Sequence, residues 1–286
     1  MRPIKCVAVI GAGVMGAGIA RVTALSGYKT ILYDERADVT SAAVAQIDGA
    51  LRRKAAEGQK ADGARDRGLG TIQAVPELSG CEPADLVVEA ITEQQDLKEE
   101  LFRRLNAICA PETILSSNTS SVPITALARA SGRAERFVGI HFMNPAPKIK
   151  GVEIIPGRLT SSEVVAAATE FVESLEKVAV LARDYSGFIT SRLIAIYLNE
   201  AAREVMDGNE PEMVDKAMLH CFNMPIGPCE LLDLVGIDVV VHALTVMTRD
   251  FGERFQPAPL LRQMVFAGQL GRKAGQGFYR YDTTSR

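Results

Sequence analysis

The fold is decided by the run CVAVI at Cys6–Ile10 and by the turn that follows it at once, Gly11-Ala12-Gly13-Val14-Met15-Gly16. An apolar run that ends in G-x-G-x-x-G and continues into a helical pattern is typical of a turn that binds a dinucleotide. Gly11 permits the tight turn, Gly13 lets a pyrophosphate approach the backbone, and Gly16 lets strand and helix pack closely. The helix that begins around Val14 and Met15 offers backbone N–H groups and a partial positive charge to the phosphates.

A second feature indicates which dinucleotide is bound. The predicted strand Thr30–Tyr33 ends at Asp34, about 20 residues beyond the glycines, where a carboxylate accepts hydrogen bonds from the adenosine ribose. The charge of this carboxylate repels a 2′-phosphate, so the sequence favours NAD over NADP, and the nearby Arg36 weakens that preference without reversing it. The alternative role for Asp34 is that of a helix-capping acid.

Short β-branched runs alternate with helical patterns over the first two-thirds of the chain. This alternation predicts an α/β fold, a Rossmann-like doubly wound sheet with helices on both faces. Residues 41–67 are helical in pattern and longer than a crossover needs, so we expect a helical arm that projects from the sheet and either is solvated or contacts substrate. The predicted strands are Cys6–Ile10, Thr30–Tyr33, Leu86–Glu89, Thr113–Ser116, Phe137–His141, Val152–Ile155 and Ala179–Leu181.

The pattern changes after Asp184–Gly187. A helical series begins at Ile189, no convincing strand follows, and Pro228 is well placed at a helix start. The sequence therefore predicts two domains, 1–185 for the dinucleotide and 186–286 as an all-α C-terminal domain for substrate and dimerisation. Apolar stripes on helices of this kind often pack against a twin subunit, which favours a homodimer.

Composition argues against several classes of protein. The 286 residues are 47% hydrophobic and 23% charged with a formal net charge of −3, so the chain is globular and has no field suited to nucleic acid. No stretch is long and apolar enough to span a membrane. The five cysteines share no C-x-x-C or metal spacing, which favours reduced thiols in the cytoplasm and no bound metal.

Among the three histidines, His141 differs from the other two. His220 and His242 lie in helical patterns and are most simply structural, whereas His141 ends a predicted strand, where open α/β sheets place their ligands. The next predicted strand carries Glu153 near its start. A carboxylate there would orient the imidazole and stabilise the imidazolium that forms when it takes a proton. A purely structural histidine is the alternative.

Several motifs, in the same order, resemble those of the 3-hydroxyacyl-CoA dehydrogenase family, in particular its short single-function 3-hydroxybutyryl-CoA members. The similarity covers essentially the whole chain, and a series of ordered motifs is more specific than one glycine turn. The shared strings are GAGVMGAGIA from Gly11, Val88–Glu93, Ser117–Ser121, His141–Pro145, Ser186–Ile189 with Arg192, Gly227-Pro228 with Glu230–Asp233, and Gly271–Lys273 with Gly277–Tyr279.

The resemblance implies NAD-dependent, reversible oxidation of a 3-hydroxyacyl thioester in fatty acid metabolism. His141 matches the family's catalytic base, Glu153 its orienting carboxylate, and Ser120 a serine that contacts the substrate oxygen. The implied partner is a small acyl thioester, of CoA or of a carrier protein. The positions that line the cofactor in the family are Glu93, Lys98, Asn118, Asn144 and Lys273.

Two positions depart from the family. Ser191 replaces the asparagine that touches the substrate carbonyl and is shorter, so we expect lower turnover or an altered choice of substrate. In the arm, Glu57 precedes Gly58 where family members commonly carry a lysine that contacts CoA, and a carboxylate there would repel CoA phosphates. The nearby cations that would compensate are Arg52, Arg53, Lys54 and Lys60.

Three functional hypotheses follow from these residues. The first is NAD-dependent interconversion of a short-chain L-3-hydroxyacyl-CoA and the 3-ketoacyl-CoA. The second is the same chemistry on a carrier-protein-bound or free 3-hydroxy acid, which Glu57 and Ser191 favour. The third is a non-catalytic NAD-binding protein, because a fold does not fix a function, and the pairing of His141 with Glu153 argues against it.

Overall fold

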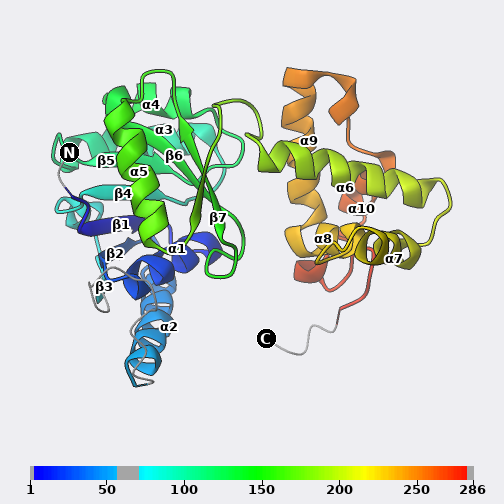
Figure 1. The fold of residues 1–286 in the computed structure, drawn as a ribbon, viewed down its shortest axis with the longest axis horizontal. Helices are drawn as coiled ribbons and strands as arrows, with labels where there is room; N and C mark the ends of the chain where they lie inside the picture. Colours follow the sequence, from blue (N-terminus) through cyan, green and yellow to red (C-terminus); the bar gives the residue numbers. More distant parts are fainter. Residues whose placement is uncertain (1–2, 57–70, 282–286) are drawn as a thin grey trace. The chain divides into compact units, whose positions relative to one another are not determined.

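The computed structural model describes residues 3–56 and 71–281 and contains an eight-stranded sheet (Figure 1). The strands are β1 (Cys6–Ile10), β2 (Lys29–Tyr33), β3 (Thr71–Ala74), β4 (Leu86–Glu89), β5 (Ile114–Ser117), β6 (Phe137–Phe142), β7 (Gly151–Pro156) and β8 (Val178–Leu181). They lie in the order β3-β2-β1-β4-β5-β6-β7-β8, and all neighbours are parallel except the antiparallel pair β6 and β7. The chain order reverses between β1 and β4, beside the glycine turn, where such folds bind their ligands.

Helices cover both faces of this sheet because successive side chains of a strand point to opposite sides. On β6, Ile140 belongs to a core shared with α1, α2 and α5. Phe137 points to the other side and packs edge-on against Phe102 of α3, with ring centroids 4.6 Å apart, and Ile124 of α4 lies against Gly139 on that side. The doubly wound α/β architecture is therefore confirmed. The helices are α1 (Val14–Leu25), α2 (Ala37–Ala56), α3 (Gln95–Ile108), α4 (Ile124–Ala130) and α5 (Ser162–Ser174).

The seven predicted strands agree with the structure within one residue at either end, but β3 was not predicted. It is an edge strand in which Ile72 alone is partly buried, so it has no apolar run to mark it. The predicted arm also differs, because α2 begins at Ala37 and packs into the core through buried Ala43, Ile47 and Leu51. Figure 1 shows the C-terminal end of α2 extending beyond the sheet. Residues 57–70, with Glu57, lie outside the described residues.

A second compact unit begins at Ser186, directly after the first unit ends at Tyr185. It is helical, with a core that includes Leu198, Leu232 and Leu244. Pro228 stands in the first turn of α8, as the sequence predicts, where its missing N–H leaves no hydrogen bond unmade. The helices are α6 (Thr190–Met206), α7 (Pro211–Cys221), α8 (Pro228–Val235), α9 (Ile237–Phe251) and α10 (Pro259–Phe266).

Three further observations concern the part of the chain that the structure describes. No single helix there is long and apolar enough to cross a membrane; α8 and α9 reach that length and composition only together, and they meet at a bend of 94°. All five cysteines are free. Over residues 3–56 and 71–281, no group of three or more His, Cys, Asp or Glu side chains is arranged to hold a metal ion.

Candidate functional site

The glycine turn between β1 and α1 combines close packing with an open stretch of backbone. Gly11 has φ +100°, and a Cβ there would lie 2.6 Å from the carbonyl oxygen of Ala90; a Cβ on Gly16 would lie 1.7 Å from the carbonyl oxygen of Gly11. Gly13 differs, because nothing lies within 4 Å of an added Cβ, and the following Val14 is 79% exposed. No side chain caps α1 at Gly13. The turn therefore leaves a helix N-terminus that fits the phosphates of a dinucleotide.

Asp34 connects the end of β2 to this turn. Its Oδ2 accepts a hydrogen bond from the Ala12 N–H at 2.7 Å, and its Oδ1 accepts one from the Arg36 N–H at 2.9 Å. The Arg36 guanidinium is exposed and contacts Asp38 at 3.0 Å. Since a carboxylate has lone pairs for more than two donors, the local contacts of Asp34 are compatible with hydrogen bonds to a ribose.

Strand alternation gathers polar side chains on one face of the sheet. Val88 and Ile140 belong to the core with α1 and α5, so their neighbours Glu89 and His141 point toward the side of α3 and α4. Ser117, at the end of β5, points to that same side. These residues lie at or near the carboxyl ends of parallel strands, which meet at one edge of the sheet. A polar site therefore forms beside the glycine turn.

His141 and Glu153 are directly opposite each other in the antiparallel pair of β6 and β7. Opposed residues of such a pair project on the same face, and His141 Nδ1 lies 2.9 Å from Glu153 Oε2. The two side chains are only 8% and 1% exposed. Because an ionised carboxylate only accepts hydrogen bonds, Nδ1 is the nitrogen that donates in this contact; in the neutral form of the ring, Nε2 then carries the lone pair.

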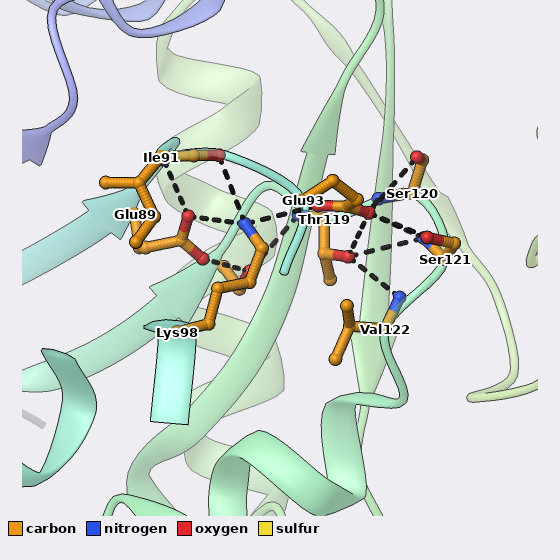
Figure 2. A network of polar contacts seen from close by, with 9 residues as sticks. Glu89, Ile91, Glu93, Lys98, Thr119, Ser120, Ser121 and Val122 are labelled. Atoms are coloured by element: carbon orange, nitrogen blue, oxygen red, sulfur yellow. Dashed lines mark hydrogen bonds and ion pairs between the residues drawn. The ribbon is translucent and has the colours of Figure 1, made fainter. Parts of the chain in front are cut away.

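Lys98 of α3 lies between two carboxylates (Figure 2). Its ammonium Nζ lies 2.6 Å from Glu89 Oε1 and 3.2 Å from Glu93 Oε2. Lys98 and Glu89 are 1% and 0% exposed, and the other oxygen of Glu89 accepts a hydrogen bond of 2.5 Å from Ser117 Oγ. Burial raises the pKa of the Glu89 carboxyl, although Lys98 acts in the opposite direction. In this cluster, one ammonium group, that of Lys98, is therefore shared by the carboxyl groups of Glu89 and Glu93.

Glu93 fixes the loop that follows β5. Its Oε1 accepts hydrogen bonds from the Thr119 hydroxyl at 2.5 Å and from the N–H groups of Ser120 and Ser121 at 2.9 and 3.0 Å (Figure 2). Burial alone would raise the pKa of Glu93, but Lys98 and these donors together lower it to about 2. The Ser120 hydroxyl also reaches Glu93 Oε1, at 3.3 Å. The carboxylate of Glu93 therefore sets the position of Ser120.

The remaining predicted residues fall into two groups. In the first unit, Asn118 Oδ1 accepts a hydrogen bond of 2.7 Å from the Phe142 N–H, which ties the end of β5 to the strand of His141, and Asn144 is exposed. In the second unit, Lys273 Nζ contacts both carboxylate oxygens of Asp238 at 2.5 and 2.7 Å. Ser191, also in the second unit, stands in the first turn of α6. Each of these residues is therefore described within its own unit.

Sequence reasoning gave no role to Glu89, nor to two buried acids of the second unit. Asp215 accepts hydrogen bonds from the Cys229 N–H at 2.7 Å and from the Tyr279 hydroxyl at 2.7 Å. Asp233 accepts hydrogen bonds from two backbone N–H groups near the C-terminus, each at 2.9 Å. A charged residue within an apolar run is the pattern that could have revealed Glu89 and Asp233, whereas Asp215 is followed by Lys216 and has no such signal.

Two family models match the chain. The NAD binding domain of 3-hydroxyacyl-CoA dehydrogenase matches residues 6–185, and the C-terminal domain of 3-hydroxyacyl-CoA dehydrogenase matches residues 187–281. The chain belongs to the 3-hydroxyacyl-CoA dehydrogenase family. Its first unit is the NAD binding domain of that family, so the cofactor predicted from the glycine turn is confirmed.

Relatives and solved structures of this family are similar over nearly the whole chain. A probable 3-hydroxybutyryl-CoA dehydrogenase of Deinococcus radiodurans is 44% identical over 275 residues, which cover 96% of this chain and 99% of that protein. The human mitochondrial hydroxyacyl-coenzyme A dehydrogenase is 40% identical, over 97% of this chain and 91% of its own. The crystal structure of Mycobacterium tuberculosis FadB2 has a TM-score of 0.90 at 37% identity, covering 98% of this chain and 100% of that one.

Proposed function

We propose that this member of the family uses NAD to interconvert a short-chain L-3-hydroxyacyl-CoA and the 3-ketoacyl-CoA, with His141 and Glu153 as the acid–base pair. The observation that carries the proposal is the 2.9 Å contact between His141 Nδ1 and Glu153 Oε2, at the edge of a sheet whose first turn fits a dinucleotide. Relatives named 3-hydroxybutyryl-CoA dehydrogenase, at 44% and 40% identity, support a short acyl chain. Such a reaction belongs to fatty acid metabolism.

We propose a task for each of three side chains. His141 takes the hydroxyl proton of the substrate on Nε2, and Glu153 holds the ring in that tautomer and stabilises the imidazolium that results. Bound at the glycine turn, NAD would supply the acceptor for the hydride of the carbinol carbon. The Ser120 hydroxyl donates a hydrogen bond to the substrate oxygen, in exchange for its 3.3 Å contact with Glu93. In the reverse direction, the imidazolium returns its proton to the same oxygen.

The alternative to this proposal keeps the chemistry and changes the group that carries the acyl chain. Ser191 stands where the family carries an asparagine, and it favours the alternative of a carrier-protein-bound or free 3-hydroxy acid. Asp34 favours NADH over NADPH in the reductive direction, because its carboxylate repels a 2′-phosphate.

A panel of substrates tests the proposal. Oxidation of NADH is measured with acetoacetyl-CoA, with acetoacetyl-carrier protein and with free acetoacetate, and each measurement is repeated with NADPH. We expect the fastest turnover with acetoacetyl-CoA and NADH. Equal rates with free acetoacetate would remove the thioester from the proposal. Tight binding of NADH without turnover that depends on His141 would instead favour a non-catalytic protein.

We also propose that the protein is a cytoplasmic homodimer formed through its second unit. Ile189, just before α6, and Leu193 and Ile196 within it are 40%, 65% and 36% exposed, and their spacing places them on one side of the helix. Exposed apolar faces of this kind commonly pack against a second copy. The free thiols of the cysteines support the cytoplasmic location. Light scattering after size exclusion tests the dimer, and Leu193→Asp is expected to yield the monomer.

A further inference from the structure

Lys177 buries its ammonium group at the turn between α5 and β8. The residue is 8% exposed. Before it, α5 ends at Ser174, and Glu176 adopts φ +60°, a left-handed conformation typical of the residue that ends a helix. The Lys177 Nζ donates hydrogen bonds of 2.7 Å to the carbonyl oxygens of Ala146 and Ile149. The ammonium group therefore binds two points of one distant segment.

Both acceptors are neutral carbonyl oxygens, so no opposite charge in this contact offsets the desolvation cost of the buried ammonium. Burial lowers the pKa of Lys177, so the ionised form loses free energy on entering the site. A methionine of similar size would fill the same space without that loss. The ammonium thus contributes something that packing alone does not supply, namely two charge-assisted hydrogen bonds to backbone carbonyls.

The segment that Lys177 binds is residues 143–150, which connects β6 to β7 and is called here the β6–β7 segment. It also lies against α1, since a Cβ added to Gly18 would stand 3.3 Å from the Cβ of Ala146. Ala146 is buried, and Asn144 precedes it by two positions. The β6–β7 segment therefore contacts both Lys177 and the helix that begins at the glycine turn.

We propose that Lys177 is a positioning residue, which fixes the β6–β7 segment against α1 and so sets the place of Asn144 and His141 relative to the glycine turn. The inference rests on the proposed function, because it assumes that a dinucleotide at the turn reacts beside His141. Hydride transfer depends steeply on the separation of the reacting atoms, and a displacement of about 1 Å costs roughly 100-fold in rate. A loosened segment would therefore impair both cofactor binding and turnover.

The test compares Lys177→Met with Lys177→Arg, which keeps the charge and the donors, and with Lys148→Met, which removes an exposed ammonium from the same segment. Thermal melts fix a temperature at which all variants are folded. At that temperature, we expect Lys177→Met to raise the Kd of NADH about 10-fold and to lower kcat about 10-fold, with the KM of acetoacetyl-CoA changed by no more than about twofold. Lys177→Arg recovers most of both losses, and Lys148→Met behaves as the wild-type protein does.

Two results would overturn the inference. One is a folded Lys177→Met protein whose Kd and kcat match those of the wild type, whatever its melting temperature. The other is an arginine variant no better than the methionine variant, because the hydrogen-bond donors would then be irrelevant. If the wild-type protein itself fails to reduce acetoacetyl-CoA, the proposed function fails, and the Kd of NADH alone decides the role of Lys177.

Discussion

In the first unit, the buried carboxylate of Glu153 faces an imidazole, that of His141, which can gain and lose a proton. In the second unit, the buried carboxylate of Asp215 faces backbone N–H groups and the Tyr279 hydroxyl, and Asp233 is bound in the same way. Partners of the second kind keep their protonation state near neutral pH. The difference teaches that burial of an acid does not mark a chemical site by itself; the partner of the acid decides whether it serves chemistry or architecture.

The largest effect should come from His141→Gln, which removes the proposed proton acceptor. We expect kcat to fall about 1,000-fold, a typical contribution of general acid–base catalysis. The Kd of NADH and the melting temperature serve as controls and should hardly change. A loss of less than about 10-fold in kcat would mean that the contact with Glu153 is architectural, as in the second unit.

Glu153→Gln should lower kcat about 100-fold, since a neutral amide no longer stabilises the imidazolium. The sharper measurement is the double variant with His141→Gln. Because Glu153 acts through the histidine, the double variant should be no slower than His141→Gln alone. If the fold-loss in kcat of the double variant equalled the product of the two single losses, the two side chains would act independently.

The ionisation of Glu93 should contribute to the pH dependence of the free energy of unfolding. Its pKa is about 2 in the fold against 4.5 for an unperturbed glutamate, so its ionisation stabilises the fold by about 3 kcal/mol. This contribution is fully present above the unperturbed value and is lost as the pH falls toward 2. Urea unfolding at several pH values should therefore show Glu93→Gln less stable than the wild type at pH 7, with a gap that narrows below about pH 4.5.

The ionisation of Glu89 should change the free energy of unfolding in the opposite direction in the same experiment. Burial raises its pKa, so its ionisation opposes folding, and stability is lost as the pH rises through the raised value. Glu89→Gln should therefore lose less stability than the wild type between acidic and neutral pH. If the free energy of unfolding changed with pH in the same direction for both variants relative to the wild type, the opposite pKa shifts of Glu93 and Glu89 would be contradicted.

Asp215→Asn tests the architectural half of the comparison. The amide cannot accept every hydrogen bond that the carboxylate accepts, so we expect a loss of about 2–3 kcal/mol in the free energy of unfolding. At a temperature where the protein is folded, kcat should stay within about twofold of the wild type. Asp250→Asn, on the exposed surface of α9, is the matched control and should change neither quantity. A large loss of kcat in folded Asp215→Asn would erase the distinction between the two units.

The smallest effect is expected from Ser191→Asn, which restores the family's residue. A longer side chain reaches the substrate carbonyl without a bridging water, so kcat/KM for acetoacetyl-CoA should rise about 3- to 5-fold. The same ratio measured with free acetoacetate shows whether the gain depends on the thioester. A decrease with acetoacetyl-CoA would indicate that serine suits a different substrate.

The sequence predicted those parts of the fold in which an apolar run coincides with an element. β3 was not predicted because an exposed edge strand needs few apolar side chains. The start of α2 at Ala37 was not predicted because the apolar period begins only later. The family resemblance predicted that Glu93 and Lys98 line the cofactor. The ion pair of Glu89 with Lys98 could not be predicted, because it depends on how α3 packs on the sheet. Lys177 in a turn resembles any solvated lysine until its distant acceptors are known.

The antiparallel pairing of β6 with β7 has a consequence for folding. His141 and Glu153 belong to one hairpin and stand 12 positions apart, so they meet when a short loop closes. Closing a short loop is fast and loses little chain entropy, whereas the parallel pairings of the sheet join distant parts of the chain. The contact between His141 and Glu153 therefore forms from local sequence, and a fragment that contains only the first unit is expected to assemble it without any residue of the helical unit.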